Sequence, residues 1–216
     1  MENKHIILKD EECYKMMTGN PILNGEEAEE LVYYYLRDKH KDNLFSIILT
    51  RDIEPHEEMI REQVQNGDVK VITNDGKVIT NEVKAIGGVY PNDFLCIDIN
   101  YIDKEGYEYD QNESTCDDLG WLYHMYYSKI YVYRCGNSWY NCKLYCINKP
   151  FRLQKDIKLF LQQNKDIKLK TFYNYYYFKR NTKDKYKNTN LCCLDLNNKE
   201  AREKFDIDVI ELDIRI

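Results

Sequence analysis

Two β-branched segments around an Asn-Asp-Gly turn constrain this chain more strongly than any other feature of its sequence. Residues 67–73 read GDVKVIT, and residues 77–85 read KVITNEVKA. Two such runs on either side of a short turn are typical of a β-hairpin. A three-residue loop closed by Gly76 in the left-handed conformation pairs Thr73 with Lys77, so the residue numbers of every further cross-strand pair add up to 150.

This register brings three charged side chains to one end of the hairpin. Asp68 stands directly opposite Glu82, and Lys84 lies two residues farther along on the same strand face. We therefore expect the two carboxylates and the amine to form one small cluster, open to solvent. A two-residue loop at Asp75-Gly76 would instead shift the pairing by one residue and move Asp68 to the other face.

A cluster of this kind has two interpretations. Two carboxylates a few ångströms apart bind a hard divalent cation through oxygen ligands, Mg²⁺ above all. The ion lowers the pKa of a bound water and neutralises charge on a phosphodiester, and a neighbouring lysine can orient the water and stabilise the transition state. The alternative is a cross-strand charge cluster on a solvated face, since 31% of the residues are charged.

An amphipathic helix is predicted upstream of the hairpin, over residues 25–40, with Asn24 as its N-cap. Its apolar stripe consists of Ala28, Leu31, Val32, Tyr35 and Leu36. Of the four glutamates near its start, Glu29 lies nearest this stripe, where a carboxylate can reach a site at the ends of the strands. The other interpretation is that these acids interact with the helix dipole.

The rest of the chain alternates between helical and strand patterns, without internal repeats. After an irregular or short helical lead-in over residues 1–20, strands are predicted at 44–50, 94–101, 129–134, 166–178, 191–196 and 207–214, and helices at 55–64, 117–127, 153–163 and 198–205. This order of elements predicts an α/β fold with a mixed sheet.

The charged residues of the helix and the hairpin occur in an order that resembles the PD-(D/E)XK nuclease superfamily. This is the restriction-endonuclease-like fold of restriction enzymes, Holliday-junction resolvases and phage recombination nucleases. The resemblance rests on Gly25-x-x-x-Glu29 in the first helix, Asp68 on a strand, and Glu82-Val83-Lys84 on the next strand. Gly67 stands where the motif has a proline.

The resemblance implies a role for each of these residues. Asp68 and Glu82 would hold the metal together with the carbonyl of Val83, Lys84 would be the catalytic lysine, and Glu29 would be an accessory acid. The expected activity is Mg²⁺- or Mn²⁺-dependent hydrolysis of phosphodiester bonds by a metal-activated water. The expected enzyme is thus an endo- or exodeoxyribonuclease, with DNA as its partner.

The resemblance also implies an architecture, a restriction-endonuclease-like core with a central mixed β-sheet flanked by helices. It covers about residues 22–135, where the strand at 94–101 and the helix and strand within 120–134 fit the later part of the core. We expect residues 1–142 to form this core and residues 143–216 to form a basic, Tyr- and Lys-rich C-terminal extension packed on it.

Charge is distributed unevenly along the chain. The net charge is −6, yet residues 143–187 contain 13 Lys and Arg against 3 acids. Lysines neutralise phosphates and aromatic rings stack on unpaired bases, so this segment predicts contact with nucleic acid. The residues expected to make it are Lys170, Tyr173, Tyr175, Tyr177, Lys179 and Arg180. The alternative is a Tyr-rich strand with alternate rings in the core and its lysines in solvent.

The eight cysteines are expected to be reduced thiols. The spacing Cys135-x6-Cys142-x3-Cys146 matches no common zinc site. An iron–sulfur centre that adds Cys13, or a zinc site, is a weaker expectation than simple packing, because free cysteine is among the most buried residue types. The adjacent Cys192-Cys193 pair has no explanation in the sequence.

Two other function classes compete with the nuclease. One is a non-catalytic nucleic-acid-binding or regulatory protein on the same fold, and the other is a Cys-ligated metal or iron–sulfur nuclease. The sequence has neither an apolar secretory segment nor a membrane-spanning stretch of about 20 residues, so a cytoplasmic protein without a membrane partner is expected. The oligomeric state stays open, a homodimer included.

Overall fold

The computed structural model describes residues 4–7, 23–86, 93–102, 126–135, 142–164, 167–181 and 188–213. The chain divides into two compact units. The first comprises Met1–Pro91, Tyr126–Pro150 and Asp206–Ile216, and the second comprises Asn92–Met125 and Phe151–Phe205.

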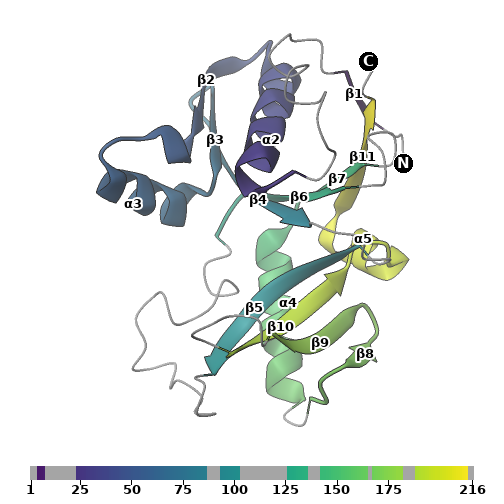
Figure 1. Cartoon of the computed structure of the whole chain (residues 1–216). Helices are drawn as coiled ribbons and strands as arrows, with labels where there is room; N and C mark the ends of the chain where they lie inside the picture. The colour runs from purple at the N-terminus through teal and green to yellow at the C-terminus, as the bar shows by residue number, and fades with distance from the viewer. Residues whose placement is uncertain are drawn as a thin grey trace. The chain divides into compact units, whose positions relative to one another are not determined.

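The first unit is built on a mixed sheet of seven strands in the order β1-β11-β7-β6-β4-β3-β2 (Figure 1). The strands are β1 (Lys4–Ile7), β2 (Leu44–Leu49), β3 (Val69–Thr73), β4 (Val78–Ile86), β6 (Lys129–Arg134), β7 (Lys143–Ile147) and β11 (Ile207–Asp213). β4 with β6 and β1 with β11 are parallel pairs, and the other neighbours are antiparallel. The expected α/β class with a mixed sheet is confirmed, whereas β1 lies where an irregular or helical lead-in was expected.

The register predicted for the hairpin β3–β4 is confirmed. Val69 pairs with Asn81 and Ile72 with Val78, so the residue numbers of each pair add up to 150. The amide of Thr73 donates to the carbonyl of Lys77 at 3.0 Å. Gly76 closes the loop with a φ of 79°, in the left-handed region that favours glycine.

The predicted first helix is α2 (Gly25–His40), which lies across the strands β2, β3 and β4 (Figure 1). Asn24 and Glu27 form a capping box at its start. Its buried residues are those of the predicted apolar stripe, Ala28, Leu31, Val32, Tyr35 and Leu36. They form the core of this unit with odd-numbered side chains of the hairpin, among them Val69, Val71 and Val83. The even-numbered side chains therefore point to the other face of the hairpin.

The 3-10 helix η1 (Thr50–Asp52) and the helix α3 (His56–Asn66) precede the hairpin, and a tight connection joins α3 to β3. α3 ends at Gly67, whose φ of 74° and ψ of −163° belong to a region that essentially glycine alone adopts. A Cβ on Gly67 would lie 2.6 Å from the carbonyl oxygen of Asn81. The buried Thr50 hydroxyl donates to the carbonyls of Gly67 (2.8 Å) and Asp68 (3.1 Å). These contacts hold the backbone of residue 67 close to the backbone of β4.

The second unit has an antiparallel sheet of four strands in the order β5-β10-β9-β8. Its elements are β5 (Phe94–Ile102), α4 (Pro150–Gln163), β8 (Thr171–Tyr173), β9 (Tyr176–Asn181), β10 (Asn188–Asp195) and α5 (Lys199–Phe205). Phe160 of α4 contacts Tyr173, Tyr176 and Phe178 on one face of this sheet, with ring centroids 5.5 to 5.8 Å apart.

Two expectations about the later elements do not match this arrangement. The strand at 94–101 was expected in the core sheet, but β5 pairs with β10, and β6 is the strand that lies parallel to β4. Nor does the division of the chain follow the expected boundary after residue 142, because β7 and β11 belong to the sheet of the first unit. The helix expected at 117–127 lies almost wholly outside the described residues.

Gly67 offers a test of this connection. Gly67→Ala should lower the free energy of unfolding by about 2–4 kcal/mol, because a Cβ meets both an unfavourable backbone conformation and the carbonyl of Asn81. Gly76→Ala is the matched control, since its φ is 79° but no atom lies within 4 Å of its Cβ position. Urea denaturation of both variants measures the difference. Equal losses would show that the close approach to β4 contributes nothing.

Candidate functional site

Asp68 and Glu82 lie at the end of the hairpin that follows α3. Asp68 immediately precedes β3, whose last pair with β4 is Val69–Asn81, and its charge acts on Glu82, the residue after Asn81. The Asp68 carboxylate accepts hydrogen bonds from the amide of Val83 at 2.7 Å and from the side chain of Gln63 at 3.1 Å. Both acidic residues are only 5% exposed. The expectation of a cluster open to solvent is therefore wrong for the two carboxylates.

Lys84 completes the predicted group. Its ammonium forms an ion pair with the Glu82 carboxylate, which also forms a hydrogen bond with Tyr127. The Lys84 side chain keeps 39% of its surface exposed, so the group meets solvent through this lysine. Two carboxylates and one ammonium thus lie together at one end of the hairpin.

Glu29 of α2 belongs to the same electrostatic environment. Its pKa is raised to about 7, first by burial and then by the negative charge of Asp68, while Arg51 and Lys84 oppose the rise. The guanidinium of Arg51 lies 3.5 Å from the Glu29 carboxylate. The four residues predicted as catalytic, Glu29, Asp68, Glu82 and Lys84, therefore interact with one another, and we call them the carboxylate cluster.

Burial and charge act against each other within the cluster. Burial raises the pKa of Glu82, Asp68 adds to the rise, and Lys84 opposes it. Burial alone would lower the pKa of Lys84, but attraction to Glu82, Asp68 and Glu29 outweighs it and raises the pKa. The lysine therefore stays protonated at neutral pH.

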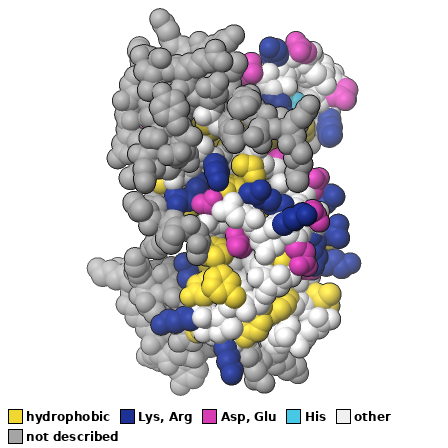
Figure 2. Space-filling model, turned by 90° about the vertical axis from the view of Figure 1, so that its right-hand side faces the viewer, with side chains coloured by type: hydrophobic (Ala, Val, Ile, Leu, Met, Phe, Trp, Pro, Cys, Tyr) yellow, Lys and Arg dark blue, Asp and Glu magenta, His cyan; other side chains and the backbone are white. Residues whose placement is uncertain are grey.

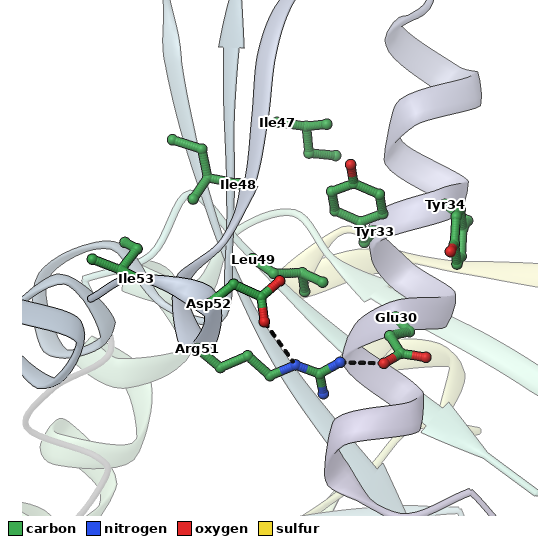
Figure 3. A pocket seen from close by; sticks show the side chains of 9 residues that line it. All are labelled: Glu30, Tyr33, Tyr34, Ile47, Ile48, Leu49, Arg51, Asp52 and Ile53. Atoms are coloured by element: carbon green, nitrogen blue, oxygen red, sulfur yellow. Dashed lines mark hydrogen bonds and ion pairs between the residues drawn. The ribbon is translucent and has the colours of Figure 1, made fainter. Parts of the chain in front are cut away.

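Arg51 links the cluster to a pocket of about 570 Å³ between α2 and β2 (Figure 3). Besides Glu29, the guanidinium pairs with Glu30 and lies 3.8 Å from the Asp52 carboxylate. Side chains of Tyr33 and Ile47 also line this pocket (Figure 3). The pocket thus has aromatic and aliphatic walls with an arginine at one end.

Sequence reasoning missed four side chains that hold the cluster, namely Thr50, Arg51, Gln63 and Tyr127. Thr50 and Arg51 come from η1, Gln63 from α3 and Tyr127 from the residues before β6, and no local spacing predicts their contacts. A signal existed for Thr50 and Arg51, because they follow a strand directly and polar residues at strand ends often belong to a site.

The donors present suit a hard cation better than a soft one. Asp68 and Glu82 offer carboxylate oxygens, and the amide of Val83 next to Glu82 donates to the Asp68 carboxylate. Mg²⁺ is commonly bound through one or two carboxylates with water and substrate phosphates as the other ligands. Over the described ranges, no group of three or more His, Cys, Asp or Glu side chains is placed to hold a metal ion.

The cysteines with near-metal spacing have separate neighbours. Cys142 accepts a hydrogen bond from the Tyr133 hydroxyl at 3.2 Å, and Cys146 lies 3.5 Å from the side-chain oxygen of Asn148. Cys135 is buried beside the carbonyl of Ile86, and Cys13 lies outside the described residues. Their surroundings in the described part of the chain are those of packed thiols.

The six residues expected to contact nucleic acid lie in the second unit, but not on one face. Tyr175 is 5% exposed, and its hydroxyl donates to Asp156 at 3.0 Å, so it is not placed to stack on a base. Tyr173 packs against Phe160 on the α4 side of the sheet. Lys170 is exposed in a turn, and the side chain of Arg180 lies outside the described set.

Tyr177 and Lys179 point to the opposite face, together with two residues that the sequence did not single out. Phe172 pairs with Tyr177 across the strands, with ring centroids 4.8 Å apart, and Phe94 stacks on Tyr177 at 6.1 Å. The Phe172 side chain is 55% exposed. We call Phe94, Phe172, Tyr177 and Lys179 the aromatic face.

Comparison of the chain with protein-family models, with curated proteins and with solved structures gave no match in any of the three. Within the described residues, no helix has the length and apolar character required to cross a membrane.

The raised pKa of Glu29 gives the sign of a pH dependence. A carboxyl with a pKa of about 7 in the folded chain and 4.5 in the unfolded chain binds more protons when folded. Its contribution to stability is therefore complete below pH 4.5 and is lost as the pH rises through 7. We expect Glu29→Gln to remove this loss, measured as the free energy of urea unfolding in EDTA across that range.

Asp38→Asn is the control for this measurement, because Asp38 is an exposed acid of the same helix and is not among the charges that shift the pKa of Glu29. If the stability of the Glu29 variant depends on pH as that of the wild type does, the Glu29 carboxyl titrates in its ordinary range.

Proposed function

We propose that the first unit is a metal-dependent nuclease that hydrolyses phosphodiester bonds, with DNA as the expected substrate. The observation that carries the proposal is the buried carboxylate pair of Asp68 and Glu82, held by neighbouring strands with Lys84 beside it. Two acids at 5% exposure are costly to a fold, and perturbed clusters of this kind are concentrated at functional sites. The PD-(D/E)XK resemblance of the same residues supports the same activity.

In this proposal, Asp68, Glu82 and the Val83 carbonyl would hold the metal. Mg²⁺ or Mn²⁺, when bound, supplies an activated water and neutralises charge on the phosphodiester. The hydrogen bonds from Val83 and Gln63 fix the orientation of the Asp68 carboxylate before any ligand arrives. Such preorganisation means that little rearrangement of the site is needed at the moment of reaction.

Lys84 has the clearest chemical role among the protein groups. Its protonated amine lies against Glu82 and keeps a solvent-exposed part, so it can turn toward a phosphate that enters the site. There it would orient the attacking water and stabilise negative charge that develops on the phosphoryl oxygens. Glu29, with a pKa near 7, can accept or give a proton at neutral pH.

The aromatic face is the proposed contact for the nucleic acid strand. Rings stack on unpaired bases without sequence preference, and a lysine beside them neutralises a phosphate. Phe172 presents the largest exposed ring of this group, and Lys179 lies on the neighbouring strand. On the side seen in Figure 2, basic and acidic side chains of the described residues are interspersed.

Two substitutions separate catalysis from metal binding. Lys84→Ala should reduce cleavage by about 10²- to 10⁴-fold while metal and DNA still bind, because the lysine acts on the water and the transition state. Asp68→Asn should lose the metal, since it removes a negative ligand from a hard-cation site. Cleavage of plasmid, linear and single-stranded DNA with Mg²⁺ or Mn²⁺, calorimetric titration with Mn²⁺ and gel shifts measure these effects.

Lys70→Ala is the matched control, because Lys70 lies on the same hairpin but pairs with Glu62 at 3.1 Å instead of with the cluster. It should cleave like the wild type. The opposite outcome has two parts: the wild type shows no metal-dependent cleavage of any DNA or RNA, and both cluster variants bind nucleic acid as the wild type does. The non-catalytic binding protein would then be the better hypothesis.

The aromatic face has its own test. Phe172→Ala should weaken the binding of a single-stranded oligonucleotide by about 5- to 150-fold, because stacking is worth about 1–3 kcal/mol per base. Lys179→Ala should lower the slope of log affinity against log salt by about 0.7 on single strands. Phe151→Ala is the control, as this ring is 64% exposed but lies on α4. Equal affinities for Phe172→Ala and Phe151→Ala would exclude the aromatic face.

A further inference from the structure

The adjacent cysteines of β10 lie in two different environments. Successive side chains of a strand point to opposite faces, so Cys192 and Cys193 cannot act together. Cys192 is fully buried on the face that carries Phe178 and Tyr176 toward α4. Cys193 points to the other face, where its cross-strand partner in β5 is Cys96.

Cys96 and Cys193 stand directly opposite each other, with their sulfur atoms 2.7 Å apart. Opposed residues of antiparallel strands have Cα atoms about 4.5–5.5 Å apart. This interval lies inside the range of about 4.4–6.8 Å that disulfides span. The two thiols can therefore be joined without movement of the backbone.

The two cysteines differ in their exposure to solvent. Cys96 is half-buried on β5, the edge strand of the sheet, whereas Cys193 is fully buried on the inner strand β10. The hydrogen bond with Cys193 lowers the pKa of Cys96 to about 7, with the charge of Lys179 helping and burial opposing. The same hydrogen bond and burial raise the pKa of Cys193. The pair thus combines a half-buried thiol of lowered pKa with a buried thiol of raised pKa.

We propose that Cys96 and Cys193 form a peroxide-reactive pair that closes to a disulfide across β5 and β10. The Cys96 thiolate attacks the O–O bond of a hydroperoxide, gives a sulfenic acid and, with one proton taken up, releases water or an alcohol. The Cys193 thiol then attacks this sulfur, forms the S–S bond, and its proton leaves with the sulfenic hydroxyl as one molecule of water. Two thiols are oxidised and one peroxide is reduced, so the step balances.

This site uses none of the residues of the carboxylate cluster, although it borders the aromatic face. Cys193 continues a cross-strand row of the aromatic face, since Phe172 pairs with Tyr177 and Tyr177 with Cys193. The cysteines of the first unit that the structure describes, Cys135, Cys142 and Cys146, are all buried and have other neighbours. Among the cysteines that the structure describes, oxidation is therefore expected at Cys96 and Cys193.

Peptide mapping of the full-length protein tests the proposal. Reduced protein is treated with hydrogen peroxide, alkylated, digested with trypsin and examined by mass spectrometry. Cleavage after Lys84, Lys104, Lys187 and Lys199 gives the peptides 85–104, with Cys96 as their one cysteine, and 188–199, with Cys192 and Cys193. The expected product is a link between these peptides, two hydrogen atoms lighter than their sum, which fragmentation assigns to Cys193.

Two variants sharpen the result. Cys192→Ser should keep the link, whereas Cys193→Ser should lose it and leave a sulfenic acid on Cys96 that dimedone traps. Because the mapping also works on the wild-type chain, a variant that does not fold leaves the test intact. Wild-type protein whose Cys96 peptide is fully alkylated after peroxide, or whose link is assigned to Cys192, would overturn the proposal.

Discussion

The register of the β3–β4 hairpin is the constraint on which the candidate site depends. It is set at one end by the three-residue loop at Gly76 and held at the other end by contacts around Gly67 and Asp68. A slip by one residue would send every side chain of one strand to the opposite face, and the two carboxylates would separate. The same slip would bring Val69 and Val71 out of the core beneath α2. Packing and site geometry therefore select the same pairing.

Burying the carboxylate cluster lowers the stability of the fold. Burial disfavours charge on Glu29 and Glu82, and the negative charge of Asp68 adds repulsion to both. Lys84 and Arg51 compensate only in part, because Arg51 is shared with the acids Glu30 and Asp52. An apolar set of the same volume would avoid these costs. Retaining the acids makes physical sense where a cation or a proton is to be handled, and this favours the catalytic hypothesis over a purely structural one.

The sequence predicted what local physics determines. The apolar stripe and cap of α2, the turn at Gly76 and the proximity of Asp68 to Glu82 all follow from contacts between residues close in the chain. The position of β5 could not be predicted in this way, since its alternating apolar residues suit either sheet and its partner β10 lies nearly a hundred residues away. The roles of Gln63 and Tyr127 stayed hidden for the same reason, because both depend on how separate elements pack.

The Tyr-rich segment shows how composition alone can mislead about a binding surface. Thirteen basic residues among aromatic rings suggested contact with nucleic acid, and alternation along β8 and β9 divides these rings between two faces, as the alternative interpretation expected. Tyr173, Tyr176 and Phe178 pack against α4, while Phe172 and Tyr177 remain on the outer face. The useful signal was therefore the parity of each residue number within its strand. The same alternation places Cys192 and Cys193 on opposite faces of β10. One rule therefore identifies both the rings on the face that can contact a base and the thiol that faces a cysteine of the neighbouring strand.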